Sequence, residues 1–283
     1  MQSRRHFLGL TGVSLLGLGL GVPALSPERS LQAAEKSSSG KIKFNLGLAS
    51  YTTRNFDQAT TIRFAKRAGL KWICFKEMHL KLDASDEECV QAALAVKKEG
   101  MQLYGAGVIT MNNTDQVENA FRYAKAAGMN TIIGVPGEKV LDLVDQKVKE
   151  TGIYLAIHNH GPGDNQYPTP ESVYEKVKHL DPKIGLCIDV GHTVRIGADP
   201  VESIYKYRDR LFDFHIKDET KAAPEGETCI CGRGIIDLPA VITALKEVEY
   251  DRVISFEYEA DADDPLPGLM ESIGYIRGLI RMM

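Results

Sequence analysis

Short runs of β-forming residues alternate with helical patterns through most of the sequence, and this alternation restricts the fold more than any other feature. Between the β-rich runs lie stretches with apolar residues at three- and four-residue spacing, as at 59–68, 87–98, 114–127 and 239–247. Gly69, Gly100 and Gly128 each follow such a stretch, where a left-handed glycine ends a helix. The eight predicted strands span 45–51, 72–77, 103–109, 131–135, 154–160, 185–191, 212–217 and 253–258.

Eight βα units within about 240 residues predict an α/β fold of the (β/α)8 TIM barrel type. We place this barrel in a single domain at 41–283. A doubly wound sheet usually has fewer strands and a phosphate-binding loop, and no G-x-G-x-x-G pattern follows the first predicted strand. The 283 residues, 43% apolar and 25% charged, are sufficient for one large core.

Residues 1–40 are expected to form a targeting segment and a linker. Arg4 and Arg5 precede an apolar run rich in Gly and Leu, and a Ser-Ser-Ser-Gly sequence follows at 37–40. This pattern resembles a twin-arginine export signal. A membrane anchor is the alternative, although the run is barely long enough to span a bilayer. We therefore expect export, to the periplasm, and no stable membrane partner once the segment is removed.

The charge pattern favours a small-molecule partner. The formal net charge is -4, and acidic and basic residues are mixed evenly along the chain, so that no basic stripe is available for nucleic acid. The barrel exterior is compatible with a homo-oligomer, but no segment specifies one. The odd number of cysteines, five, does not define a disulfide scaffold: Cys74 and Cys187 lie in apolar strands, and Cys229 and Cys231 are expected as two loop thiols.

Polar residues end four consecutive predicted strands, although the strands of a parallel barrel should be almost wholly apolar. Carboxylate and imidazole groups together suit Mn²⁺, Mg²⁺, Co²⁺ or Zn²⁺ without selecting among them. Strand alternation puts on one face each of the pairs His158 and His160, Cys187 and Asp189, His215 and Lys217, and Glu257 and Glu259.

From about residue 44 to the end, the chain resembles the xylose-isomerase-like family, which belongs with the sugar phosphate isomerases and the family 2 AP endonucleases. The resemblance implies a metal held at the ends of strands five to eight by Glu, Asp, His and Glu. Asp189, His215 and Glu257 match the last three positions. In the Asp-Val-Gly-His sequence, His192 resembles the family's substrate-binding histidine, and Arg233 in Gly-Arg-Gly resembles the arginine that contacts sugar oxygens.

The sequence departs from the family at strand five, where Glu-Asn-His becomes His158-Asn159-His160. His158 is the expected fourth metal ligand and a second candidate catalytic group, since a histidine can transfer protons near neutral pH. His160 stays open as the alternative strand-five ligand and is otherwise expected to bind substrate. Glu257 remains as the one clear carboxylate base of the family type.

Two further regions are candidates for the substrate site. Near strand two, Glu77 and His79 share a face and Lys76 points the other way, so that either side could line the mouth or form only structural ion pairs. Lys217 is expected to bind a substrate oxygen, with an ion pair to Glu259 as the alternative. The irregular stretch at 219–234 is expected to cover the substrate or to be a decorative loop.

These features predict a metal-dependent sugar isomerase or epimerase that removes a proton next to a carbonyl group of a carbohydrate. A lyase or dehydratase acting on a 3-keto-glycoside or an inosose is the alternative, because elimination needs no symmetric second carboxylate. Phosphodiester cleavage would require a basic groove, which the sequence does not show. A sugar-binding barrel without catalysis is the non-enzymatic alternative.

Overall fold

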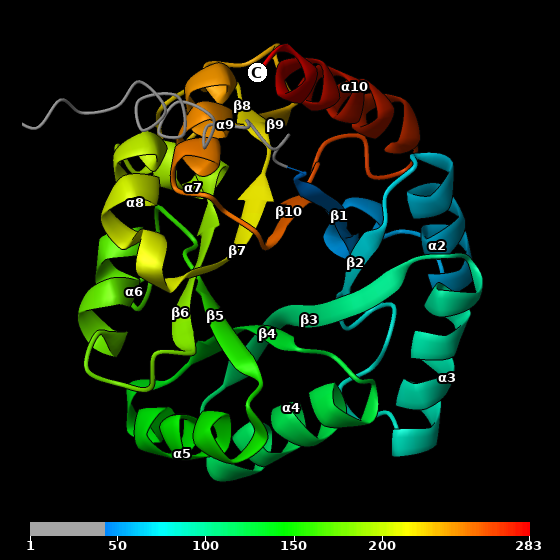
Figure 1. Ribbon diagram of the computed structural model, residues 1–283, viewed down its shortest axis with the longest axis vertical. Coiled ribbons are helices and arrows are strands. Elements are labelled where there is room, and N and C mark those ends of the chain that lie inside the picture. The colour runs from blue at the N-terminus through cyan, green and yellow to red at the C-terminus, as the bar shows by residue number, and fades with distance from the viewer. Residues whose placement is uncertain (1–42) are drawn as a thin grey trace, which may run out of the picture. The chain divides into compact units, whose positions relative to one another are not determined.

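The computed structural model describes residues 43–283, and eight of their strands form one closed barrel. All neighbouring strands pair in parallel, in the order β1-β10-β7-β6-β5-β4-β3-β2, and helices surround the ring (Figure 1). The predicted (β/α)8 barrel is therefore confirmed, whereas the export segment predicted at 1–40 lies outside the described residues. The barrel strands are β1 (Asn45–Ala49), β2 (Trp72–Phe75), β3 (Gln102–Met111), β4 (Thr131–Pro136), β5 (Tyr154–His158), β6 (Ile184–Asp189), β7 (Leu211–Ile216) and β10 (Val253–Phe256).

The helices begin and end at the residues that the sequence marks. Ser85 and Glu88 form a reciprocal capping box at the start of α3, and Gly69 follows α2 with a φ of +69°. The α-helices are α2 (Gln58–Arg67), α3 (Asp86–Lys98), α4 (Thr114–Ala126), α5 (Leu141–Thr151), α6 (Pro170–Val177), α7 (Val190–Arg195), α8 (Pro200–Tyr207), α9 (Leu238–Glu247) and α10 (Leu266–Met282). The 3-10 turns are η1 (Ser50–Thr53), η2 (Glu138–Val140) and η3 (Arg208–Arg210).

Two apolar clusters hold the barrel together. The larger one lies between strands and helices, because each amphipathic helix buries its apolar face against the sheet. The smaller cluster consists of Cys74, Tyr104, Ile133, Ala156, Cys187 and Val253. Cys74 and Cys187 are fully buried, as expected, and all five cysteines are free.

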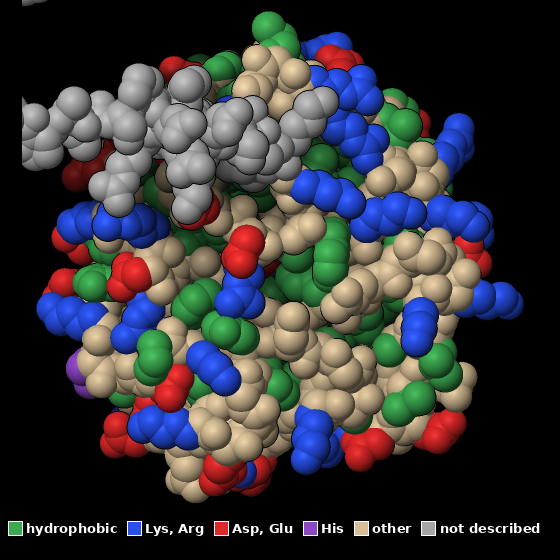
Figure 2. Space-filling model, viewed as in Figure 1, with side chains coloured by type: hydrophobic (Ala, Val, Ile, Leu, Met, Phe, Trp, Pro, Cys, Tyr) green, Lys and Arg blue, Asp and Glu red, His purple; other side chains and the backbone are tan. Residues whose placement is uncertain are grey.

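A short antiparallel hairpin, β8 (Asp218–Glu219) with β9 (Thr228–Cys229), follows β7. Apart from Asp218, it lies within the stretch at 219–234 that was predicted to be irregular. On the visible part of the face in Figure 2, Lys and Arg side chains are interspersed with Asp and Glu side chains. Within residues 43–283, no helix combines the length and the apolar character needed to cross a bilayer.

Candidate functional site

The four residues predicted to hold a metal lie together at the carboxyl ends of four neighbouring strands. His158 ends β5, Asp189 ends β6, His215 lies near the end of β7, and Glu257 directly follows β10. Each residue is at most 3% exposed. One nitrogen or oxygen atom of each lies within 4.8 Å of those of the other three. Parallel strands in a barrel bring their carboxyl ends to one rim, which explains why residues so distant in sequence meet here.

The distances between these atoms fit a tetrahedral metal site. His158 Nε2 lies 3.1 Å from His215 Nδ1 and 3.5 Å from Asp189 Oδ2. His215 Nδ1 lies 3.0 Å from Glu257 Oε2. Four ligands at bond lengths of about 2.1 Å around one ion are about 3.4 Å apart. Asp189 Oδ2 is buried and receives no well-aligned hydrogen bond from the described residues, and the Lys217 ammonium lies beside it at 2.9 Å.

The protonation states of His158, Asp189 and Glu257 also suit a metal. Burial holds the pKa of His158 well below its usual value, so the ring is neutral near pH 7 and can donate a lone pair. Burial alone would raise the pKa of Asp189, but the Lys217 ammonium lowers it below its usual value. For Glu257, His215 and two lysines overcome the same effect of burial and lower the pKa. Both carboxylates are therefore ionised at neutral pH. Burial would lower the pKa of His215, but Cys187 and Glu257 raise it above its usual value, so a cation here would displace a proton from that ring.

Lys217 contacts the two carboxylates of this group directly. Its ammonium lies 2.9 Å from Asp189 Oδ2 and 3.0 Å from Glu257 Oε2, and its side chain is 1% exposed. The ion pair with Glu259 that the sequence allowed is also present. Lys217 thus neutralises the carboxylates from below the protein surface, and it is not one of the residues that line the adjacent pocket.

A pocket of about 360 Å³ opens onto the candidate metal ligands and contains three of the predicted substrate residues, His160, His192 and Glu77. Burial lowers the pKa of both histidines, which favours their neutral forms. The residues that line the pocket are Tyr51, Lys76, Glu77, Met78, Val108, His158, His160, His192, Glu257 and Glu259.

His160 has a partner that the sequence reading missed. Its Nδ1 lies 3.2 Å from Asp164 Oδ2, and the other oxygen of Asp164 accepts hydrogen bonds from the backbone N–H groups of Gln166 and Tyr167. This carboxylate is therefore fixed and orients the imidazole. Asp164 lies four residues after His160 in a Gly-rich loop, where no strand or helix period indicates which way it points.

Of the residues that follow strand two, Lys76 and Glu77 both line the pocket and His79 does not. The strand ends at Phe75, so the alternation of faces does not extend to residue 79. Lys76, not His79, turns toward the site: its Nζ lies 3.1 Å from Glu257 Oε1. His79 is 4% exposed, and its two ring nitrogens contact the hydroxyls of Ser50 and Thr61. Those contacts hold the η1 turn and α2 together, and His79 does not line the pocket.

Arg233 is also not brought to the pocket. Its guanidinium forms a two-pronged ion pair with Glu271 of α10, and its side chain is 62% exposed. The cause is Asp218, which is fully buried and accepts backbone hydrogen bonds from residues 219, 232, 234 and 236. These bonds fix the loop in a conformation that directs Arg233 toward α10.

The Asp-Val-Gly-His sequence requires its glycine for a close approach. A Cβ atom at Gly191 would lie 2.5 Å from Glu219 Oε1 and 2.6 Å from the Lys217 side chain, which is closer than real Cβ contacts. The glycine thus allows α7 to pack directly on the end of β7 and on β8. Its neighbour His192 donates its backbone N–H to Asp189 Oδ1 at 2.8 Å, which fixes the carboxylate.

Glu219 makes the stability of the fold depend on pH. Its Oε1 accepts a hydrogen bond from Thr228, and burial raises the pKa of Glu219 from 4.5 to about 7. Because the folded state binds this proton more tightly than the unfolded state, the stability contribution of Glu219 is present below pH 4.5 and is lost as the pH rises to about 7. We expect Glu219→Gln to raise the thermal midpoint relative to wild type at pH 8 by more than at pH 5. If the thermal midpoints of Glu219→Gln and wild type differ by the same amount at pH 5 and pH 8, the raised pKa of Glu219 is contradicted.

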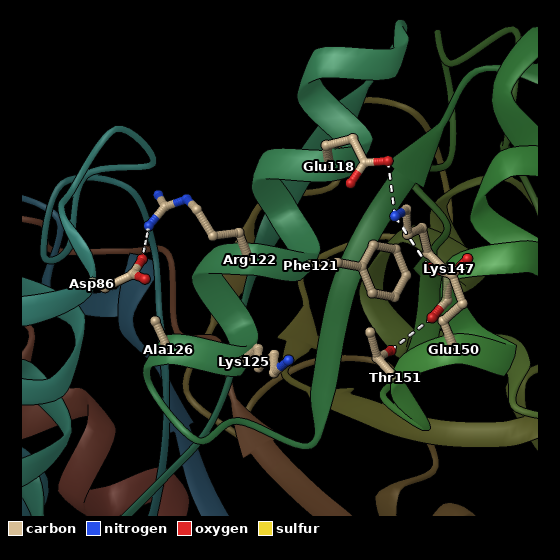
Figure 3. Close-up of a pocket in the computed structure, with 9 residues that line it drawn as sticks. All are labelled: Asp86, Glu118, Phe121, Arg122, Lys125, Ala126, Lys147, Glu150 and Thr151. Carbon is tan, nitrogen blue, oxygen red and sulfur yellow. Dashed lines mark hydrogen bonds and ion pairs between the residues drawn. The ribbon is translucent and has the colours of Figure 1, made fainter.

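Another groove, of about 610 Å³, lies on the outside of the barrel beside α4 and α5. Figure 3 shows Lys147 directed at Glu118 and Glu150, and Arg122 directed at Asp86. Exposed ion pairs of this kind contribute about 1 kcal/mol or less. None of the predicted site residues lines this groove.

Comparison with solved structures finds the same fold at low sequence identity. An IOLI protein with bound zinc superimposes with a TM-score of 0.70 at 19% identity, covering 84% of this chain and 98% of that one. A 3-keto-D-glucoside 4-epimerase from E. coli superimposes with a TM-score of 0.68 at 16% identity, covering 83% of this chain and all of that one.

Sequence comparison also finds relatives. An inosose dehydratase of Lacticaseibacillus casei is 29% identical in an alignment 138 positions long, which covers 43% of this chain and 45% of the relative. An inosose isomerase of Bacillus subtilis (strain 168) is 28% identical in an alignment 156 positions long, which covers 47% of this chain and 55% of the relative. This chain thus spans about half the length of the curated relatives it matches. The sequence model of the xylose isomerase-like TIM barrel family matches residues 62–279, and the chain therefore belongs to this family.

Proposed function

We propose that this protein is a divalent-metal-dependent sugar isomerase or epimerase. The observation that carries the proposal is the convergence of His158, Asp189, His215 and Glu257 beside a pocket that two of them line. Relatives named as inosose isomerase and inosose dehydratase, and structural neighbours named as sugar epimerases, support a small polyol or sugar as the substrate.

Different residues of the pocket accept the proton and bind the substrate. A divalent cation held by the four ligands would stabilise the negative charge that develops on the carbonyl oxygen. Glu257 is ionised and lines the pocket, so its carboxylate accepts the proton from the carbon next to the carbonyl. Lys76 holds Glu257 Oε1 at 3.1 Å. His160, oriented by Asp164, and His192 bind hydroxyl groups of the substrate, and one of them returns a proton to the substrate after it has taken one up from solvent.

Elimination is the second candidate reaction, and the identity of His158 favours it. The site has an imidazole where the family has a carboxylate, so an exchange of one proton between two equivalent carboxylates is not available. A lyase needs one base, Glu257, and one proton donor for the leaving group. Both reactions need a proton donor, and the structural neighbours named as sugar epimerases keep isomerisation or epimerisation as the leading proposal.

The charges of the pocket favour a substrate without phosphate. Its lining contains three carboxylates, Glu77, Glu257 and Glu259, but only one lysine, Lys76, which is already paired with Glu257. An anionic substrate would face repulsion here. An uncharged sugar also agrees with the export that we propose from the twin-arginine-type segment. The two imidazole ligands favour Mn²⁺, Co²⁺ or Zn²⁺ over Mg²⁺, which prefers oxygen ligands.

The proposal is tested by metal content and product identity. The purified protein is stripped with a chelator, reloaded with Mn²⁺, Co²⁺, Zn²⁺ or Mg²⁺ separately, and incubated with free ketoses and with 3-keto-glycosides. We expect turnover only in the reloaded protein and the appearance of an epimer or isomer. Release of an aglycone, or of an enone, would establish the lyase instead. Ligand binding without turnover with any of the metals would reduce the protein to a sugar-binding barrel.

A further inference from the structure

A fully buried carboxylate, Asp213, lies next to the candidate metal site without being one of its ligands. It is on β7, two residues before His215, and is 0% exposed. Removing an ionised carboxylate from water costs several kcal/mol unless hydrogen bonds or opposite charges compensate. The groups around Asp213 should therefore show which hydrogen bonds and charges compensate its burial.

Three polar side chains from three other strands surround Asp213. The hydroxyl of Tyr104 on β3 donates to Asp213 Oδ1 at 3.0 Å, and Ser255 on β10 lies 2.6 Å from the same hydroxyl. Because Tyr104 gives its proton to Asp213, Ser255 donates to Tyr104. The thiol of Cys187 on β6 donates to Asp213 Oδ2 at 3.4 Å. All of these side chains are buried. The group is thus a built hydrogen-bonded layer beneath the site.

The two ring nitrogens of His215 face different groups. Nδ1 faces the other candidate ligands, at 3.1 Å from His158 Nε2 and 3.0 Å from Glu257 Oε2. Nε2 points the other way and lies 3.3 Å from Asp213 Oδ2. Within the described part of the chain this contact is not aligned as a hydrogen bond, and Asp213 is the carboxylate that lies within 4.0 Å of this nitrogen.

We propose that Asp213 is a positioning residue for the metal site: it takes the N–H at Nε2 of His215 and so orients the ring with Nδ1 toward the cation. A neutral imidazole carries one proton, and the hydrogen bond made by one nitrogen decides which nitrogen is free. Metal-bound histidines commonly give their other N–H to a carboxylate, which also makes them stronger ligands. Tyr104, Ser255 and Cys187 hold the Asp213 carboxylate in place. The inference rests on the metal site of the proposed function and not on its substrate.

The test is the metal affinity of the full-length protein, measured by titration calorimetry of the chelator-stripped protein with Zn²⁺ or Co²⁺. Asp213→Asn keeps the size of the side chain but removes its charge, and we expect the dissociation constant to rise about 10- to 100-fold. Tyr104→Phe removes one hydrogen-bond donor to Asp213 and is expected to raise the metal dissociation constant by a smaller factor. Cys74→Ser, in the same buried cluster as Tyr104, is the matched control and should leave it unchanged.

A purely structural role for Asp213 predicts a different result. It would lower the thermal midpoint of the stripped protein and leave the dissociation constant within twofold of wild type, and this outcome would overturn the proposal. A wild-type protein that binds neither metal would overturn it as well. If Asp213→Asn does not fold, Tyr104→Phe decides, because an unchanged metal affinity in that variant contradicts the proposal. The metal dissociation constants can be measured whether or not any sugar is turned over, so this inference can be tested separately from the proposed reaction.

Discussion

Glu257→Gln is expected to lower turnover by about 10³-fold while the protein still folds and binds its sugar ligand. The substitution keeps the size of the side chain but removes both the carboxylate that accepts the proton and one anionic metal ligand. A single general base accounts for about 10²- to 10⁴-fold in rate. The measurement is kcat with the sugar that the panel identifies, at saturating metal, together with the equilibrium affinity for that sugar.

Glu259→Gln is the matched control for this loss. Glu259 lies two residues after Glu257, also lines the pocket and also contacts Lys217, but it is not one of the four ligand-type residues. We expect the turnover rate of Glu259→Gln to stay within about tenfold of wild type, since Glu259 supplies no proton acceptor at the metal. If turnover falls equally in Glu257→Gln and Glu259→Gln, Glu257 is not the catalytic base. Full activity of Glu257→Gln would refute the mechanism.

Lys217→Met is expected to destabilise the metal-free protein by about 3–5 kcal/mol, because removing one partner of a buried ion pair leaves uncompensated charge. Without the ammonium, the carboxylates of Asp189 and Glu257 stay buried within about 3 Å of the place it occupied. The free energy of unfolding is measured by urea denaturation in the presence of a chelator. A divalent metal at 100 times its dissociation constant should restore about 2.7 kcal/mol, because it binds the folded state.

Lys66→Met provides the comparison, since Lys66 forms an ion pair with Glu99 on the surface and its side chain is 57% exposed. Surface pairs contribute about 1 kcal/mol or less. If Lys217→Met costs no more than Lys66→Met, Lys217 does not compensate the buried carboxylates. If added metal stabilises wild type but not Lys217→Met, the cation and the ammonium do not share the same two carboxylates.

The sequence by itself was sufficient to predict the barrel and the four polar residues that lie together at its rim. Eight β-rich runs separated by amphipathic helices have few other ways to bury their apolar faces. Within a strand the side chains alternate with a period of two, so His215 and Glu257 could be placed on the inner face before any contact was known. The same period applies to Asp213, two residues before His215, and it could have identified this residue as well.

Only the tertiary structure decided the residues beyond the strand ends. Lys76 and His79 lie beyond the end of the strand. Hydrogen bonds with Ser50 and Thr61 direct the His79 ring, and an ion pair with Glu257 directs the Lys76 side chain. Arg233 follows a loop that Asp218 fixes through backbone N–H groups, and Asp164 meets His160 through a turn. The physical reason is the same in each case: strand geometry repeats with a fixed period, whereas a loop takes the conformation that satisfies its own buried polar groups.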